Sequence, residues 1–189
     1  FKKISFTPFG NYKWQIPWNT QYGDPGIYDV QNIITKRLTL GFNSAYKPTN
    51  WLSFIVGSQY YNDNFRHHRK TLVLKSGQYV QSINGYNAYA EATFSTKIVN
   101  INIGGRFDKY AYFKPIVLPR ISFTKELKKW HYKLLYGQSY KIPPLQNMNL
   151  DVTGTLVPEQ LTDIQAEVGF HSKFYDASIT GFNTAINKV

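Results

Sequence analysis

The sequence VNINIGGRFDKY, residues 99–110, alternates apolar and polar side chains at almost every position. Ile101 and Ile103 fall on one set of alternate positions, and Asn102 and Arg106 fall on the other. Because successive side chains of a β-strand point to opposite faces, this stretch predicts a strand with one apolar and one polar face. It is longer than the average strand of about 5–6 residues and reaches the roughly 9–11 that a tilted strand needs to cross a bilayer.

The same period recurs along the chain, whereas helical periodicity is hard to find. Leu40 and Phe54 stand on the apolar positions of two further alternating stretches, and Tyr132 stands on those of a third. The predicted strands are residues 2–8, 10–17, 33–46, 51–63, 86–96, 99–110, 118–126, 130–142, 162–173 and 176–187. The sequence therefore predicts an all-β fold made of long strands, each with one polar face in contact with water.

Short and long connections alternate between these predicted strands. The short ones are residues 47–50, 96–98, 125–129 and 173–175, the long ones are 64–85 and 143–161, and 111–117 is intermediate. Short turns at one end and longer loops at the other are typical of outer-membrane barrels. We therefore predict an antiparallel meander that is part of a transmembrane β-barrel. A small complete outer-membrane barrel and a soluble all-β binding module are the alternatives.

Composition restricts the class of protein further. The chain has 189 residues, of which 42% are apolar, 17% charged and 17% aromatic, with a mean hydropathy of −0.39. This length suits one domain, and a disordered chain would contain fewer aromatic residues. The absence of cysteine excludes disulfides, thiolate metal sites and cysteine nucleophiles. No apolar run reaches the roughly 18–20 residues of a membrane helix. Because Phe1 rather than Met opens the sequence, we expect a piece of a longer protein.

The net charge of +11 raises the question of a nucleic-acid partner. Basic residues are dispersed among strands, turns and loops, and no nucleic-acid module is visible, so we expect no such partner. Basic loops and turns beside anionic lipid headgroups are a simpler source of this charge. The common signatures of hydrolases, zinc proteases and phosphate-binding loops are absent from the sequence, so we expect neither an enzyme nor a cofactor.

Aromatic residues gather near the ends of the predicted strands. Trp51 and Trp130 follow short turns, Tyr46 precedes one, and Tyr60 and Tyr61 lie near the opposite end of their strand. Rings with an apolar body and a polar tip form girdles at the two water interfaces of membrane barrels. The alternative is that tyrosine and tryptophan are simply favourable strand residues.

Several motifs between residues 99 and 183 resemble those of one family. They read GGRFD (104–108), LPRISF (118–123), LLYGQSYKIP (134–143), LVPE (156–159) and EVGF (167–170). In order and spacing they resemble the barrel of TonB-dependent outer-membrane receptors. The residues that carry this resemblance most directly are Tyr136, Gly137, Pro143, Pro158 and Glu159.

The resemblance implies a role and a set of partners. Receptors of this family take up a scarce solute such as a ferric siderophore, haem, cobalamin or glycan, driven by the TonB complex, in the outer membrane of Gram-negative bacteria. Their barrels have 22 strands, so about ten predicted strands indicate the middle portion of one. We accordingly expect residues 1–189 to be a partial barrel that lacks the plug domain. Its partners would be outer-membrane lipid, a small molecule or metal chelate, and TonB through the missing N-terminal region.

Charged residues on the polar strand positions are candidates for the barrel lumen. They are Glu91, Arg106, Arg120, Lys133 and Glu167. We expect them to pair with one another and with the plug, the alternative being the exposed polar face of a soluble sheet. The apolar positions predicted to face lipid are Leu40, Phe54, Ile101, Ile103, Phe123, Tyr132 and Val168.

A basic stretch in the predicted loop 64–85 is a candidate for ligand capture. Together with two tyrosines near the loop 111–117, the candidate residues are Arg66, His67, His68, Arg69, Tyr110 and Tyr112. An anionic ligand, a lipopolysaccharide phosphate or a metal chelate would suit them, and a solvated loop tip is the alternative. Two adjacent histidines rarely hold a metal without a third ligand, so we predict no metal site.

Overall fold

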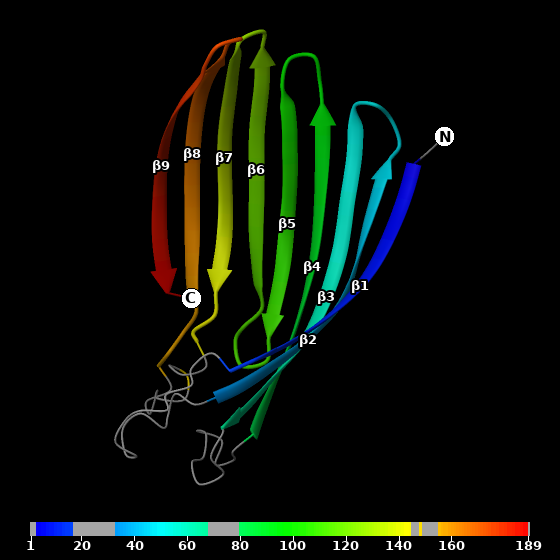
Figure 1. The fold of residues 1–189 in the computed structure, drawn as a ribbon, viewed down its shortest axis with the longest axis vertical. Helices are drawn as coiled ribbons and strands as arrows, with labels where there is room; N and C mark the ends of the chain where they lie inside the picture. Colours follow the sequence, from blue (N-terminus) through cyan, green and yellow to red (C-terminus); the bar gives the residue numbers. More distant parts are fainter. Residues whose placement is uncertain (1–2, 17–32, 68–79, 145–147, 149–154, 189) are drawn as a thin grey trace.

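The computed structural model describes residues 3–16, 33–67, 80–144, 148 and 155–188, and its strands form one antiparallel sheet (Figure 1). The strands are β1 (Lys3–Gln15), β2 (Ile33–Lys47), β3 (Leu52–His67), β4 (Val80–Ser95), β5 (Asn100–Tyr110), β6 (Ile116–Leu127), β7 (Trp130–Lys141), β8 (Glu159–His171) and β9 (Asp176–Lys188). Each pairs with the next, so the order is β1 to β9 and these two strands form the edges. The predicted all-β meander of long strands is confirmed. No helix among the described residues is both long and apolar enough to cross a membrane.

The connections differ at the two ends of the strands. Residues 48–51, 96–99, 128–129 and 172–175 form turns at what we call the short-turn end. Residues 16–32, 68–79, 111–115 and 142–158 connect the strands at the opposite, long-loop end. The alternation of connection lengths that the sequence predicts is therefore present throughout the sheet (Figure 1).

The pairing register divides the side chains between two faces. Ile103 pairs with Ala92 and Ile121, and the same alternation carries one face across the sheet. This face holds all seven apolar residues predicted above, namely Leu40, Phe54, Ile101, Ile103, Phe123, Tyr132 and Val168. Asn102 pairs with Thr93 and Ser122 on the other, mostly polar face.

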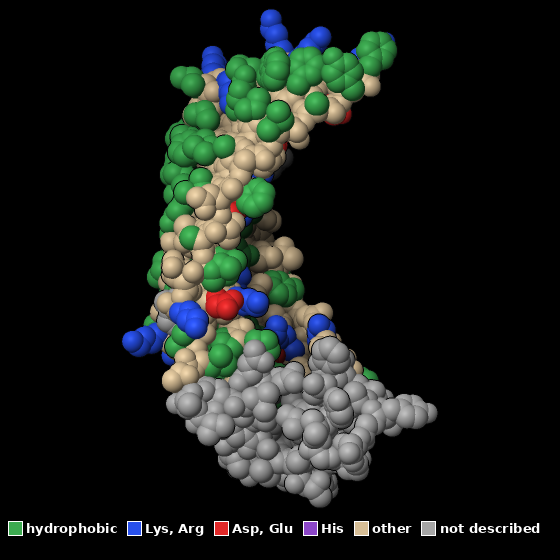
Figure 2. Space-filling view, turned by 90° about the vertical axis from the view of Figure 1, so that its left-hand side faces the viewer, with side chains coloured by type: hydrophobic (Ala, Val, Ile, Leu, Met, Phe, Trp, Pro, Cys, Tyr) green, Lys and Arg blue, Asp and Glu red, His purple; other side chains and the backbone are tan. Residues whose placement is uncertain are grey.

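The sheet is curved, and the polar face is its concave side. Figure 2 shows hydrophobic side chains along the convex side. Side chains converge on the inside of a curved sheet, and the buried residues of the described strands, glycines aside, all lie on that face. They are Asp63, Ile83, Asn87, Asp108, Tyr110 and Leu118. The apolar convex face is correspondingly left uncovered, with large side chains such as Leu134 and Val168 more than two-fifths exposed.

The prediction of two strands at the start of the chain was wrong. Residues 2–8 and 10–17 were expected to be separate, but β1 runs from Lys3 to Gln15 without a break. Gly10 pairs directly with Leu40, so it makes no turn. Within the described sheet β1 is an edge strand, the position at which proline is usually tolerated.

Two loops predicted as long are shorter because their flanking strands extend further. β3 continues to His67 and β4 begins at Val80, so the loop predicted over 64–85 is reduced to residues 68–79. Polar side chains hold this extension together: Asn62 Nδ2 donates to Ser82 Oγ at 2.8 Å and to Asn84 Oδ1 at 2.5 Å. β8 likewise begins at Glu159 rather than at residue 162.

Candidate functional site

A buried carboxylate lies on the concave face near the long-loop end. The side chain of Asp63, in β3, is only 1% exposed. Arg37 of β2 donates from Nε and Nη2 to its two oxygens at 2.5 and 2.6 Å, and Tyr110 of β5 donates its hydroxyl at 2.5 Å. The Arg37 guanidinium also lies 5.6 Å from the centre of the Tyr61 ring. These contacts tie β2, β3 and β5 together beneath the long connections.

Replacing Asp63 by Asn is expected to lower the free energy of unfolding by about 1.5–3 kcal/mol, because hydrogen bonds to charged groups contribute roughly this much. The loss stays below that of a fully buried ion pair because the Arg37 side chain is 50% exposed and reaches water. Urea titration followed by tryptophan fluorescence measures the change.

The matched control is Asp176→Asn. Asp176 is also ion-paired, with His171, but both side chains are 72% exposed. Exposed pairs contribute little, so this variant should be close to the parent. Equal losses in the two variants would contradict the structural role of Asp63.

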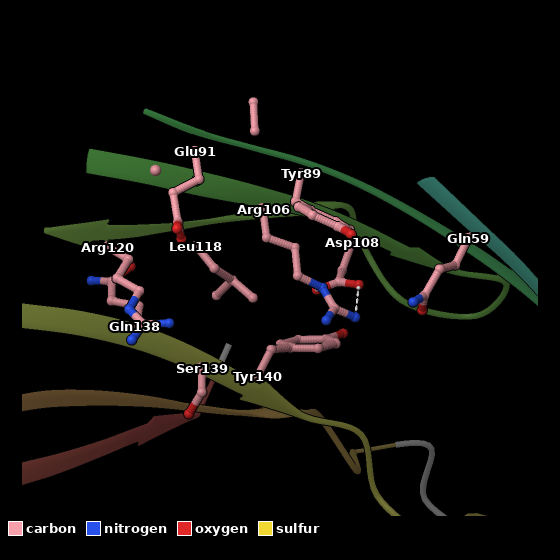
Figure 3. A pocket seen from close by; sticks show the side chains of 13 residues that line it. Gln59, Tyr89, Glu91, Arg106, Asp108, Leu118, Arg120, Gln138, Ser139 and Tyr140 are labelled. Carbon is pink, nitrogen blue, oxygen red and sulfur yellow. Dashed lines mark hydrogen bonds and ion pairs between the residues drawn. The ribbon is translucent and has the colours of Figure 1, made fainter. Parts of the chain in front are cut away.

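The concave face also contains an open depression, which reaches Asp108, two residues before Tyr110 in β5. Its volume is about 530 Å³. Its lining comes from the five strands β3 to β7, and its polar residues include Tyr89, Glu91, Arg106, Asp108, Arg120 and Tyr140 (Figure 3). The depression is open and polar, so it suits a hydrated or oxygen-rich partner better than an apolar one.

The charged side chains within the depression differ in whether they have a partner. Arg106 forms a two-point pair with Asp108, with Nε 2.8 Å and Nη2 2.9 Å from the carboxylate oxygens. Glu91 accepts a hydrogen bond of 2.7 Å from Asn102 Nδ2. Arg120 has no hydrogen-bond or ion-pair partner in the part of the chain that the structure describes. Its guanidinium is therefore the group in this depression that remains free to bind an anion.

An interruption in the sheet creates this depression. β6 and β7 pair only from Arg120 and Gly137 towards the short-turn end, although β6 begins at Ile116 and β7 ends at Lys141. Pro119 contributes to the break, since it has no backbone N–H to donate. Between the diverging strands, Tyr140 of β7 lies next to the Arg106 and Asp108 side chains (Figure 3).

The predicted lumen residues occupy one face but do not pair with one another. The register places Glu91, Arg106, Arg120, Lys133 and Glu167 on the concave side. Glu167 instead contacts His131 Nε2 at 3.1 Å and the Thr180 hydroxyl at 3.1 Å. Lys133 lies opposite Glu167 in the register, yet these two side chains form no ion pair among the described residues.

The predicted ligand-capture residues are not gathered in one loop. Arg66 and His67 belong to β3, whereas His68 and Arg69 lie outside the described residues. Tyr110 was expected near a loop surface, but it is the last residue of β5, only 5% exposed, and is bound to Asp63. Tyr112 is exposed in the 111–115 connection, where its hydroxyl oxygen accepts a hydrogen bond of 3.2 Å from Gln81 Nε2.

The residues of the family motifs lie around the junction of β7 and β8. Lys141 and Glu159 are opposite each other in the register, with Nζ and Oε2 3.9 Å apart. Pro143 and Glu159 border a small depression of about 170 Å³, and Pro158 is buried beside it. Tyr136 and Gly137 lie within β7. Pro143, Pro158 and Glu159 therefore lie where this hairpin opens into its long connection.

Comparison with known proteins identifies a similar fold but no matching sequence family. No family model matches the chain, and no curated protein matches it. Its structure is similar to that of the siderophore receptor PirA from Pseudomonas aeruginosa, with a TM-score of 0.65, 15% identity, and coverage of 80% of this chain and 32% of the receptor. For the siderophore receptor PirA from Acinetobacter baumannii the TM-score is 0.64 and the identity 19%, with coverage of 81% and 27%. The chain thus spans about a third or less of these receptors and has the fold of part of a receptor barrel.

Proposed function

We propose that this chain forms part of the barrel wall of a TonB-dependent receptor that imports a scarce solute across the outer membrane. The observation that carries the proposal is the two-faced curved sheet, which has an apolar convex side, a polar concave side and its long connections at one end. In a bilayer such a sheet places lipid against the convex face and the water-filled or plugged interior against the concave face. The likeness to siderophore receptors supports this class of transport.

The open edges of the sheet support the assignment to a section of a larger barrel. β1 and β9 are at opposite ends of the strand order and do not pair with each other. An unpaired strand edge in hydrocarbon leaves backbone groups unsatisfied, at several kcal/mol each. We therefore propose that further strands of the same barrel complete both edges, that the plug domain lies elsewhere in the protein, and that residues 1–189 alone do not transport.

We assign different roles to the two faces and the two ends of the sheet. Glu91, Arg106, Arg120, Lys133 and Glu167 are assigned to the channel side, where they contact the plug or the passing solute. Ligand capture is assigned to the long-loop end, which carries Arg66 to Arg69 and Tyr112. A ferric siderophore is the leading substrate class, ahead of haem, cobalamin and glycans, because the similar solved structures are siderophore receptors.

Cysteine labelling tests the assignment of the two faces. The chain contains no cysteine, so each single-cysteine variant reports one position. In membranes, cysteines at Phe54, Ile103 and Val168 are expected to react with a lipophilic maleimide and to resist a water-soluble one. Cysteines at Arg106 and Lys133 should show the opposite preference. Mixed reactivity within either set would contradict the membrane assignment of the faces.

Solute uptake by a deletion strain tests the proposed function. A bacterium lacking the complete gene should lose uptake of one member of a panel of radiolabelled ferric siderophores, haem, cobalamin and oligosaccharides under nutrient limitation. The complete gene should restore that uptake, and a protonophore or loss of TonB should abolish it. Unchanged uptake of every solute, or uptake that does not depend on TonB, would refute the proposal.

A further inference from the structure

A cluster of lysines surrounds the short-turn end of the sheet. We call it the lysine rim, and its members are Lys47, Lys97, Lys125, Lys128, Lys129 and Lys173. Five of the six side chains are exposed, and Lys125 is half-buried. The turns and strand ends that carry them contain only two carboxylates, Glu126 and Asp176, and Asp176 is already paired with His171. The short-turn end therefore has a formal excess of four positive charges.

The positive charge of the rim is not neutralised within the sheet. None of the six lysines forms an ion pair with any described residue. At the long-loop end Arg37 is paired with Asp63 and Lys141 with Glu159, although Lys13, Lys36, Lys114 and Lys188 at that end also form no ion pair with any described residue. Lys125 Nζ donates to the backbone carbonyl of Lys97, which joins the end of β6 to the turn between β4 and β5.

The turn between β6 and β7 carries lysine where backbone geometry favours other residues. Leu127 pairs with Trp130, so Lys128 and Lys129 form a two-residue turn. Lys128 has a φ of 51°, in the left-handed region. Two-residue hairpin turns with positive φ strongly favour Asn or Gly. The turn geometry therefore does not account for the lysine at position 128, and its charge is the property left to explain.

Aromatic rings lie directly behind the lysines. Trp51 stacks on Phe94 with ring centres 6.4 Å apart, and Trp130 meets Phe170 edge-on at 4.9 Å. At the tips of two turns an apolar side chain stands beside a lysine: Ile98, 80% exposed, follows Lys97, and Phe174, 88% exposed, follows Lys173. Figure 2 shows basic side chains and hydrophobic side chains together at this end of the molecule.

We propose that the lysine rim binds the phosphate groups of anionic phospholipids in the membrane leaflet at the short-turn end. The inference rests on the proposed membrane location. In a bilayer, aromatic rings lie at the headgroup boundary, and lysine side chains reach from there to the phosphates. The short-turn end has the same order, with its aromatic rings behind its lysines. Lysine side chains are attracted to an anionic lipid surface, so an unpaired group of six favours anionic over zwitterionic lipid.

Quenching by brominated lipid measures this preference at the rim itself. Trp51 and Trp130 lie there, and replacing Trp14 and Trp18 by Phe in the intact protein removes the other two of the four tryptophans from this chain. Any tryptophan in the rest of the intact protein is replaced in the same way. The protein is folded into vesicles of phosphatidylcholine mixed with brominated phosphatidylglycerol, and quenching is compared with that by brominated phosphatidylcholine. We expect a binding preference of about 2–5-fold for the anionic lipid, which high salt should reduce.

Two sets of variants locate the effect. Replacing Lys97, Lys128, Lys129 and Lys173 by Gln should bring the preference close to one. The same change at four lysines of the long-loop end, Lys13, Lys36, Lys114 and Lys188, should leave it unchanged. The single variant Lys128→Asn removes a charge while suiting the turn, so it should fold normally and show a measurable part of the loss.

Three results would overturn the inference. They are equal quenching by the two lipids in the parent protein, equal loss in both variant sets, and binding of soluble peptidoglycan chains without lipid preference. The last result would assign the rim to the cell wall. Failure of solute uptake with the lipid preference intact would refute the proposed transport function alone, whereas intact uptake without lipid preference would refute only this inference.

Discussion

Ile103→Arg is expected to reduce the stability of the protein folded in lipid vesicles by about 2–4 kcal/mol, the range for a cation at the lipid-facing midplane of a barrel. Ile103 is the fourth residue of β5, lies between Ala92 and Ile121 on the convex face, and is 47% exposed. An arginine there has no carboxylate neighbour across either strand pair, and it would remain charged in hydrocarbon. Urea titration of folding and unfolding in vesicles measures the effect.

The neighbouring substitution Asn102→Arg provides the control at the same membrane depth. Asn102 is on the concave face, where its Nδ2 donates to Glu91 at 2.7 Å and to Thr93 at 3.0 Å. An arginine at this position has the Glu91 carboxylate within reach, so we expect a loss below about 1 kcal/mol. Equal losses at positions 102 and 103 would mean that the faces are misassigned, and no loss at Ile103 would favour a soluble all-β module.

Much of the sheet is readable from the sequence because its faces differ so strongly. Ile101 and Ile103 alternate with Asn102 and Arg106. Because a strand has only two faces, this pattern puts the isoleucines on one face and the polar residues on the other. The turns at the short-turn end are also predictable, because each interrupts the alternation over a few residues. The meander and its sorted connections therefore follow from local pattern alone.

The ends of the strands were less predictable, since both faces become polar there. Hydrogen bonds between side chains extend the β3–β4 hairpin, from Asn62 to Ser82 and Asn84. The alternation of apolar and polar residues in the sequence does not reveal such contacts. The sequence prediction ends one strand at Pro8 and begins the next at Gly10, whereas β1 runs through both, since the effect of a proline depends on whether its strand lies at an edge. Edge position is a property of the whole sheet and is not visible in a local window.

The candidate site depends on register, which sequence period does not determine. Arg37 and Asp63 both fall on polar strand positions, yet nothing in the sequence says that they lie opposite each other in β2 and β3. Tyr110 is predicted from the sequence to take part in ligand capture, whereas its hydroxyl is donated to Asp63. Arg106 was singled out, but its partner Asp108, two residues along the same strand face, was missed.

A glycine beneath two tyrosine rings is the basis of the second large expected effect. Gly85 lies on the concave face of β4, and a Cβ atom added there would lie 2.3 Å from the Tyr61 ring and 2.8 Å from the Tyr110 ring. These rings pack on each other with centres 5.5 Å apart, and Tyr110 holds Asp63. Gly85→Val is therefore expected to destabilise the folded protein by about 3 kcal/mol, the upper part of the usual range for overpacking.

Gly105→Val in the adjacent strand β5 is the matched control. A Cβ atom at Gly105 would have only the Leu118 carbonyl oxygen nearby, at 3.8 Å, so valine meets ordinary contact distances there. Because valine favours strands, this variant should be neutral or slightly more stable. If the clash with Tyr61 causes the loss at position 85, Tyr61→Ala should recover part of it in a double-mutant cycle. Strictly additive losses from Gly85→Val and Tyr61→Ala would show that the two residues do not compete for the same space.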